Sequence, residues 1–230
     1  MNWNNFKFIF IIISLTVSIF MRNNIVAQNY EYLDSLQSQK KHIALKKTNI
    51  FIVGNFEGCE KDTIFFHYFS CCLNKSISEI PSSDNEWEDI IAWFRDYRVE
   101  TFFTYKKDTL KIGEAYGLYC LMNLGDVNSD GMDEFAFVID KLDDSRLNSC
   151  KIYKICQSQF YLAKSFSLNE SSFDTPISGT TDSIKGIRGF LEKKNNTWYY
   201  CNVDDYDDEK FPVMRILDLD DIKCTNFDSF

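Results

Sequence analysis

The sequence predicts a mostly β domain of antiparallel sheets with one inserted amphipathic helix. Short apolar runs rich in β-branched and aromatic residues recur along the chain, separated by Gly, Asn, Asp and Ser. One stretch near the middle has helical periodicity instead. Hydrophobic residues make up 45% of the 230 positions and aromatic residues 16%, so the chain can bury a core and is not disordered.

The strands are predicted from these apolar runs and the turn residues between them. In chain order they are residues 49–54, 63–69, 99–105, 109–112, 135–139, 150–156, 160–162, 166–168, 186–192 and 197–203. Turns are predicted at 106–108 and 193–196. A polar stretch from 169 to 182, with Pro176 and Gly179 as breakers, is predicted to be a loop.

The helix is predicted from residue 84 to 98. Ser83 and Glu86 match a capping box, in which each residue would satisfy a free amide at the helix start. The apolar positions with helical spacing are Trp87, Ile90, Ile91, Phe94 and Tyr97. Such a stripe is typical of a helix face that packs on a core.

One loop has a pattern of residues that is typical of a cation-binding site. Asp126, Asn128 and Asp130 place side-chain oxygens at alternate positions, Gly131 turns the chain, and Glu134 closes the loop. Calcium takes six to eight oxygen ligands, and a loop that folds back on itself can supply several of them, including a backbone carbonyl. We expect that carbonyl to come from Met132.

The loop resembles the Asp-x-Asn-x-Asp-Gly loop of EF-hands, dockerins and the FG-GAP or VCBS repeats of β-propellers such as the integrin α head. An EF-hand needs an acidic residue at loop position 12, where this chain has Phe137. A strand after the loop fits the FG-GAP type, and Tyr116-Gly117 looks like its aromatic-glycine pair.

This resemblance implies a fold and a ligand set. The fold would be a set of antiparallel sheets resembling an incomplete or degenerate β-propeller. The implied ligands are Asp126, Asn128, Asp130, the Met132 carbonyl and Glu134, and the last departs from the Asp that the family usually has. The metal-free alternative is an Asx-rich turn between two strands.

A second loop looks like a degenerate copy of the first. Gly54, Asn55 and Glu57 repeat the glycine and the first two oxygen-bearing positions, but Cys59 stands where Asp130 would be. Cysteine is a poor ligand for a hard cation. We therefore expect one calcium ion rather than two.

The first 27 residues are predicted to be a signal peptide. Lys7 precedes an apolar run from 8 to 21, which is too short for an ordinary membrane span, and Ala27 suits cleavage before Gln28. The alternative is an uncleaved anchor, which Arg22 after the run would favour. Residues 28–47 would be a lead-in and 48–230 the domain, placed outside the cytoplasm in a periplasmic or secreted location.

Net charge and cysteine content limit which partners, disulfides and metal ions the chain can have. A net charge of −9 argues against nucleic acid. Eight cysteines in an oxidising compartment allow disulfides; Cys150 and Cys156 could bridge across a hairpin, and one of the vicinal Cys71 and Cys72 could be a buried free thiol. Zinc is disfavoured, because the chain has no Cys-x2-Cys pair and only two histidines.

The sequence therefore predicts an exported calcium-binding module, not an enzyme, whose ion stabilises a loop and whose surface binds another protein or a carbohydrate. The alternative is a small extracytoplasmic hydrolase that uses acidic residues with calcium. No nucleophile with a paired base and no Gly-x-Ser-x-Gly is present. A pocket with two carboxylates, one of raised pKa, would favour the hydrolase.

Overall fold

The computed structural model describes residues 44–58, 61–82, 84–143, 145–170, 173, 186–205 and 213–219. The predicted signal peptide, most of the lead-in and most of the loop at 169–182 lie outside these residues. No helix in the described part of the chain is long and apolar enough to cross a membrane.

The fold is mostly β, as predicted, with one α-helix, α2 (Trp87–Tyr97), and one short 3-10 helix, η2 (Val203–Asp205), among the described residues. The strands are β1 (Leu45–Lys47), β2 (Ile50–Gly54), β3 (Asp62–Ser70), β4 (Lys75–Ile77), β5 (Glu79–Pro81), β6 (Val99–Tyr105), β7 (Asp108–Gly113), β8 (Ala115–Gly125), β9 (Glu134–Lys141), β10 (Leu147–Cys156), β11 (Gln159–Asn169), β12 (Gly186–Ile187), β13 (Leu191–Lys194), β14 (Thr197–Tyr200) and β15 (Arg215–Ile216).

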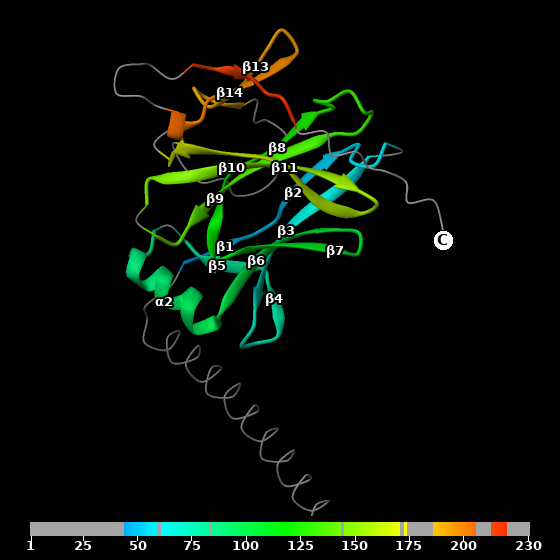
Figure 1. Cartoon of the computed structure of the whole chain (residues 1–230). Coiled ribbons are helices and arrows are strands. Elements are labelled where there is room, and N and C mark those ends of the chain that lie inside the picture. The colour runs from blue at the N-terminus through cyan, green and yellow to red at the C-terminus, as the bar shows by residue number, and fades with distance from the viewer. Residues whose placement is uncertain are drawn as a thin grey trace, which may run out of the picture.

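These strands form three larger antiparallel sheets in succession. The first has the order β2-β3-β6-β7 with β4 on β3, the second β8-β9-β10-β11 and the third β12-β13-β14-β15 (Figure 1). A small β1-β5 pair lies beside the first sheet. The helix α2 is inserted between β5 and β6, which agrees with the predicted insertion. Successive up-and-down sheets are consistent with a propeller-like arrangement.

Strand β9 in the central sheet, β8 to β11, is buried on both faces. Phe135 and Phe137 of β9 pack in a core shared with the first sheet and α2, whereas Ala136 and Val138 pack in a second core toward β12–β15. Side chains alternate between the two faces of a strand, so a strand covered on both sides is apolar throughout. This accounts for the continuous apolar run from 135 to 139.

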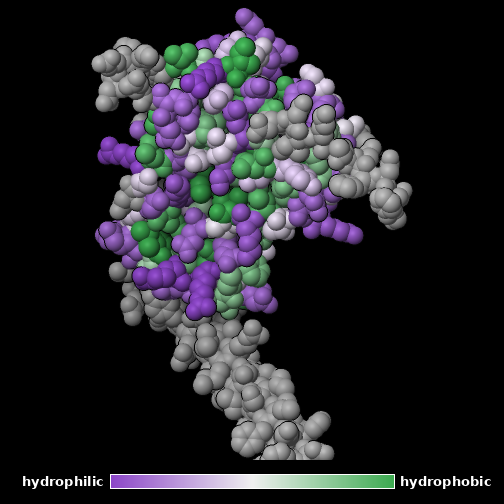
Figure 2. Space-filling view, viewed as in Figure 1, coloured by the Kyte–Doolittle hydropathy of each residue, from purple (hydrophilic) through white to green (hydrophobic). Residues whose placement is uncertain are grey.

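The outer surface is mainly polar. Figure 2 shows hydrophilic side chains over most of one face, with smaller apolar areas between them. This distribution suits a chain with a net charge of −9.

The predicted helix start is wrong. α2 begins at Trp87 rather than at residue 84, and its N-cap residue Glu86 makes no side-chain capping hydrogen bond. The helix ends where Arg98 adopts a left-handed φ of 46°. Trp93 is buried although the stripe omitted it, because the buried face of α2 is wider than one narrow stripe.

Most strand predictions are confirmed with shifted boundaries, but the run predicted as one strand at 186–192 is wrong: it forms two paired strands, β12 and β13, with a turn at 188–190 between them. The strand predicted at 197–203 ends at Tyr200. The two runs at 160–162 and 166–168 belong to one strand, β11, because β10 pairs with it over its whole length. The turn predicted at 193–196 contains only residues 195 and 196. Cross-strand pairing extends these strands beyond their apolar cores.

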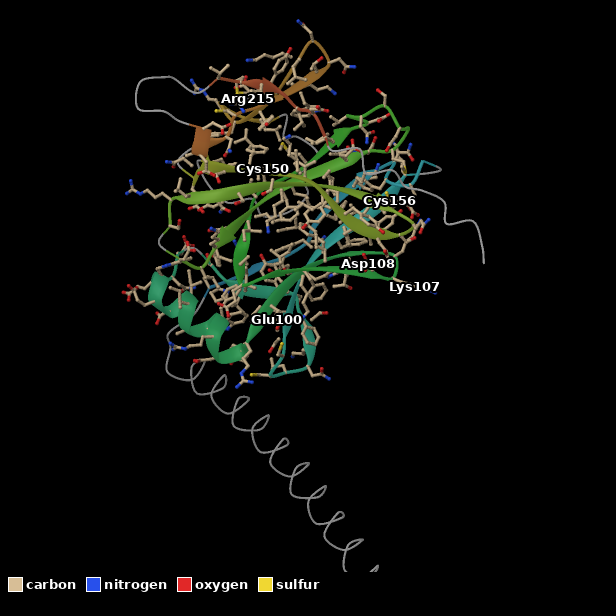
Figure 3. All side chains as sticks on the ribbon, viewed as in Figure 1. Glu100, Lys107, Asp108, Cys150, Cys156 and Arg215 are labelled. Atoms are coloured by element: carbon tan, nitrogen blue, oxygen red, sulfur yellow. The ribbon has the colours of Figure 1, made fainter. Side chains whose placement is uncertain are left out.

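The predicted bridge between Cys150 and Cys156 does not form. Both residues lie on β10, where six residues of strand span about 20 Å, so their sulfurs cannot meet (Figure 3). Cys156 is disulfide-bonded, whereas Cys150 is a buried free thiol. Cys71 and Cys72 are both free, but Cys71 is exposed and Cys72 half-buried, so neither is the buried thiol expected there.

Candidate metal centre

The acidic loop closes the hairpin between the two central strands. Gly125 at the end of β8 pairs with Glu134 at the start of β9, which leaves residues 126–133 as the connection. Ser129 and Gly131 have φ angles of 63° and 86°. These left-handed residues turn the loop back on itself, and glycine adopts such angles at little cost.

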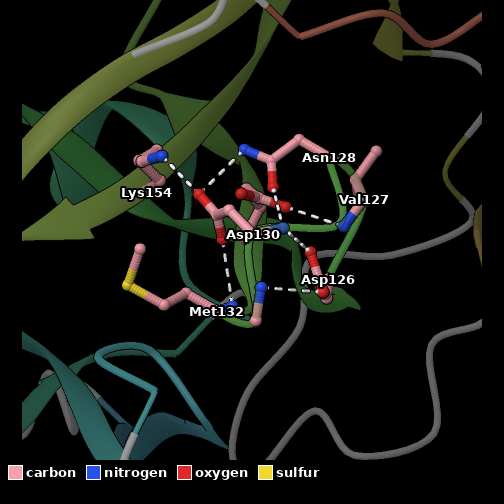
Figure 4. Close-up of polar contacts among 8 residues, drawn as sticks. Asp126, Val127, Asn128, Asp130, Met132 and Lys154 are labelled. Carbon is pink, nitrogen blue, oxygen red and sulfur yellow. Dashed lines mark hydrogen bonds and ion pairs between the residues drawn. The ribbon is translucent and has the colours of Figure 1, made fainter. Parts of the chain in front are cut away.

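Side-chain oxygens face the inside of this loop and accept backbone N–H groups (Figure 4). Asp126 Oδ1 and Oδ2 accept from Asp130 and Gly131, each at 3.0 Å. Asn128 Oδ1 also accepts from Asp130, at 3.1 Å. Asp130 Oδ1 accepts from Met132 at 3.0 Å. The loop thus gathers the oxygen-bearing residues that the sequence identified.

Glu134 lies beneath the loop and is fully buried, with 0% of its surface exposed. Its Oε2 accepts the Val127 N–H at 2.9 Å, but Oε1 has no hydrogen-bond partner within the described part of the chain. Desolvation raises the pKa of Glu134 to about 7, assisted by Asp130 and Asp126 and opposed by the Val127 N–H. A buried oxygen without a donor costs on the order of 1–3 kcal/mol.

A buried lysine completes the loop. Lys154 projects from β10, is 2% exposed, and places Nζ at 2.6 Å from Asp130 Oδ2. Desolvation raises the pKa of Asp130, but the hydrogen bonds from Lys154, Met132 and Asn128 outweigh it and hold that pKa below its ordinary value. The sequence signal that could have found Lys154 is a lysine inside the apolar strand run 150–156.

The charges of this cluster do not cancel. Asp126, Asp130 and Glu134 carry three negative charges when ionised, and Lys154 carries one positive charge. In the conformation described, no three His, Cys, Asp or Glu side chains converge closely enough to hold a metal ion. The carboxylates of Asp126 and Asp130 are bound by loop amides and by Lys154, so a metal ion would have to compete with these donors for them.

The second, degenerate loop docks against the first. Asp133 Oδ2 accepts the Asn55 N–H at 2.8 Å and Asn123 Nδ2 at 2.7 Å, and the Asp133 N–H donates to the Asn55 carbonyl at 2.8 Å. Asn55 Nδ2 also donates to the Gly131 carbonyl at 3.1 Å. Asp133 therefore faces away from the acidic cluster and joins the two loops.

Two carboxylates beside the degenerate loop, those of Glu57 and Asp62, are engaged by neighbouring residues, whereas Asn55 Oδ1 is buried with no hydrogen-bond partner among the described residues. Glu57 pairs with Lys106 and accepts the N–H and hydroxyl of Ser158 at 2.6 and 3.0 Å. Asp62 accepts the Tyr105 hydroxyl at 2.5 Å. These contacts leave few free oxygens for a second ion.

A polar pocket lies at the opposite end of β9. It has a volume of about 300 Å³ and is lined by Asn85, Trp87, Ile90, Tyr116, Tyr119, Asp140, Lys141, Asp143 and Glu170. The sequence did not mark this pocket, because its residues come from α2, two strands and the segment after β11.

No protein-family model, curated protein or solved structure matches this chain. The resemblance to FG-GAP and VCBS repeats therefore depends on the loop residues themselves.

Proposed function

We propose that this chain is an exported calcium-binding module of FG-GAP/VCBS-like type, in which one ion stabilises loop 126–134 and the surface binds another molecule. The observation that carries the proposal is the Glu134 carboxylate. It is fully buried at the closing position of the loop, and its Oε1 has no donor among the described residues. A cation supplies what this oxygen lacks.

The metal-free alternative explains only part of the loop. An Asx-rich turn accounts for Asp126, Asn128 and Asp130, which cap backbone amides. A turn does not need a buried glutamate beneath it whose pKa is raised to about 7. With all three carboxylates ionised and Lys154 counted, the cluster has an excess of two negative charges, which equals the charge of one Ca²⁺.

In the proposed complex the ligands are Asp126, Asn128, Asp130, the Met132 carbonyl and Glu134. Lys154 would give up its contact with Asp130 or share that carboxylate with the ion. The stoichiometry would be one ion per chain, since Glu57 and Asp62 of the degenerate loop already bind Lys106, Ser158 and Tyr105.

The rival function, a hydrolase using acidic residues with calcium, has one observation in its favour. Asp140 lines the pocket with Glu170, and its pKa is raised to about 6, chiefly by burial. However, Glu134 and Asp140 are six residues apart on β9, about 20 Å along an extended strand. An ion in the loop could not act on a substrate in the pocket, so we favour a binding module.

The experiment is calorimetric titration of the calcium-free protein with CaCl₂, supported by thermal melts in calcium and in chelator. One site per chain is expected, together with a higher melting temperature in calcium. Glu134→Gln should abolish the heat of binding, whereas Glu114→Gln, at an exposed position outside the loop, should retain it. Wild-type protein that shows no calcium-dependent heat and no shift in melting temperature would refute the proposal.

A further inference from the structure

The pocket at the far end of β9 holds buried charge that the calcium loop does not use. Its floor is Asp140, only 6% exposed, and its walls include Trp87 from the first turn of α2, Tyr116 and Tyr119 from β8, and Glu170. A volume of about 300 Å³ is at the lower end of the range for small-molecule sites. The pocket therefore suits a ligand of a few heavy atoms.

The two carboxylates compete for one donor. The Tyr119 hydroxyl donates to Glu170 Oε2 at 3.3 Å, and the same hydroxyl interacts with Asp140. Glu170 has a second donor, Asn148 Nδ2, at 2.7 Å from Oε1. A phenol has a single proton, so the buried Asp140 carboxylate is the less well satisfied of the two.

The charge of the pocket favours a cation. Asp140, Asp143 and Glu170 carry three negative charges, and the nearby cations within the described residues are Lys46 and Lys141. Lys141 Nζ is turned away to the Leu147 carbonyl at 3.3 Å. An excess of one negative charge remains even when both lysines are counted.

The chain itself shows how this wall holds an ammonium group. Lys46 Nζ lies 4.2 Å from the centroid of the Tyr116 ring, and it interacts electrostatically with Asp140. Aromatic faces attract cations in this geometry. Lys46 is not among the residues that line the pocket, so its ammonium does not fill the cavity.

The aromatic geometry distinguishes between ligand classes. Trp87 and Tyr116 meet edge to face, with ring centroids 5.9 Å apart and an interplanar angle of 86°. Two perpendicular rings form a corner, whereas a sugar stacks on one open, flat ring. A corner beside the buried Asp140 and the half-buried Glu170 fits a compact cation that can also donate hydrogen bonds.

We propose that this pocket binds a small primary ammonium compound, whose N–H groups donate to Asp140 and Glu170 and whose charge lies against Trp87 and Tyr116. The carboxylates give orientation through hydrogen bonds, and the rings contribute cation–π attraction. A quaternary ammonium lacks N–H donors and should bind more weakly.

The test is titration of the full chain with n-butylammonium chloride in chelator, so that the outcome does not depend on the calcium loop. Calorimetry measures the affinity, and the Trp87 indole signal in a proton–nitrogen correlation spectrum reports the site. Saturable binding with a shift of that signal is expected. n-Butanol should not bind, and tetramethylammonium should bind less tightly than n-butylammonium.

Matched variants locate the site. Asp140→Asn and, separately, Glu170→Gln should each weaken n-butylammonium binding at least about tenfold, the effect of losing one charged hydrogen bond. Glu88→Gln makes the same charge change on the exposed side of α2 and should bind as the wild type does. Glu170→Gln keeps the test decisive if Asp140→Asn does not fold.

Any one of four outcomes would overturn the inference. No saturable binding of n-butylammonium, equal binding by n-butanol, or wild-type affinity in both the Asp140→Asn and the Glu170→Gln variants would each do so. Saturation by glucose with no response to the amine would also overturn it and would identify a sugar pocket instead.

Discussion

Lys154 Nζ lies 2.6 Å from Asp130 Oδ2 inside the acidic loop, at a position that is 2% exposed to solvent. This ion pair brings a positive charge to the carboxylate that a calcium ion would need. A buried pair of this kind is costly to break by removing one partner, because the other charge is left unpaired. Lys154 and calcium are therefore competitors for Asp130.

Replacing Lys154 with methionine should raise the affinity for calcium. The variant fills a similar volume without a charge, so Asp130 becomes free to bind the ion, and we expect Kd to fall by about tenfold or more. Calorimetric titration of both proteins measures the change. Lys164→Met, at the half-buried position where Lys164 Nζ contacts the Asp218 carbonyl, serves as the control for loss of a lysine charge. Equal affinities in wild type and Lys154→Met would show that the lysine does not compete.

Asp130→Ala should remove the calcium response of stability. An ion that binds only the folded state stabilises it by about 2.7 kcal/mol when calcium is 100-fold above Kd. The wild type should therefore melt several degrees lower in chelator than in calcium, and the variant should melt at one temperature in both. Calorimetric melts provide the measurement. If the wild type itself melts alike in both buffers, the stretch is only an acidic turn.

The loop could be predicted from sequence because its geometry is local. Asp126, Asn128 and Asp130 are two residues apart, and a glycine after them fixes the turn, so short-range spacing contains most of the information. Lys154 is 24 residues beyond Asp130, and its approach depends on the pairing of β9 with β10. Such a contact follows from the register of the sheet, which the sequence pattern does not specify.

The distinction between local and long-range contacts also explains where the other predictions differ from the structure. Most of the longer strands were predicted because apolar runs are also local, but β8 was not predicted. The start of α2 was not predicted correctly either, since Ser83 and Glu86 matched a capping pattern that Glu86 does not use. The pocket around Asp140 is formed by four segments that are distant in the sequence. Burial of Asp140 could not be predicted from its place at the end of an apolar strand.

Asp133→Ala should lower stability without changing the calcium response. Asp133 joins the two loops by accepting from the Asn55 N–H and Asn123 Nδ2. Removing it leaves both donors without this acceptor, and we expect the free energy of unfolding to fall by about 2 kcal/mol. Urea denaturation in calcium and in chelator should show the same decrease. Asp133→Asn, which keeps one acceptor oxygen, should lower the free energy of unfolding by less than Asp133→Ala does. A variant that no longer responds to calcium would instead identify Asp133 as a ligand.

The last prediction concerns the dependence of stability on pH that Asp140 causes. Burial raises the pKa of Asp140 to about 6, with Glu170 raising it further and Tyr119 and Lys46 opposing the shift. The ordinary value for this carboxyl is 3.8. Because the folded pKa lies above the unfolded one, the folded state binds the proton more tightly. Ionisation of Asp140 then disfavours folding as the pH rises from about 4 to about 6.

The size of this effect follows from the shift. Two pKa units correspond to about 3 kcal/mol, present as stability below pH 4 and lost above pH 6. The Asp140→Asn side chain cannot ionise, so the variant should not lose this stability as the pH rises. We would measure the free energy of unfolding of both proteins by urea denaturation at pH 4, 5, 6 and 7. The free energy of the variant should increase relative to that of the wild type as the pH rises. Glu134 also titrates in this range but is present in both proteins, so its contribution cancels in the difference. Parallel stability curves for the two proteins would mean that Asp140 ionises in the fold as readily as in water.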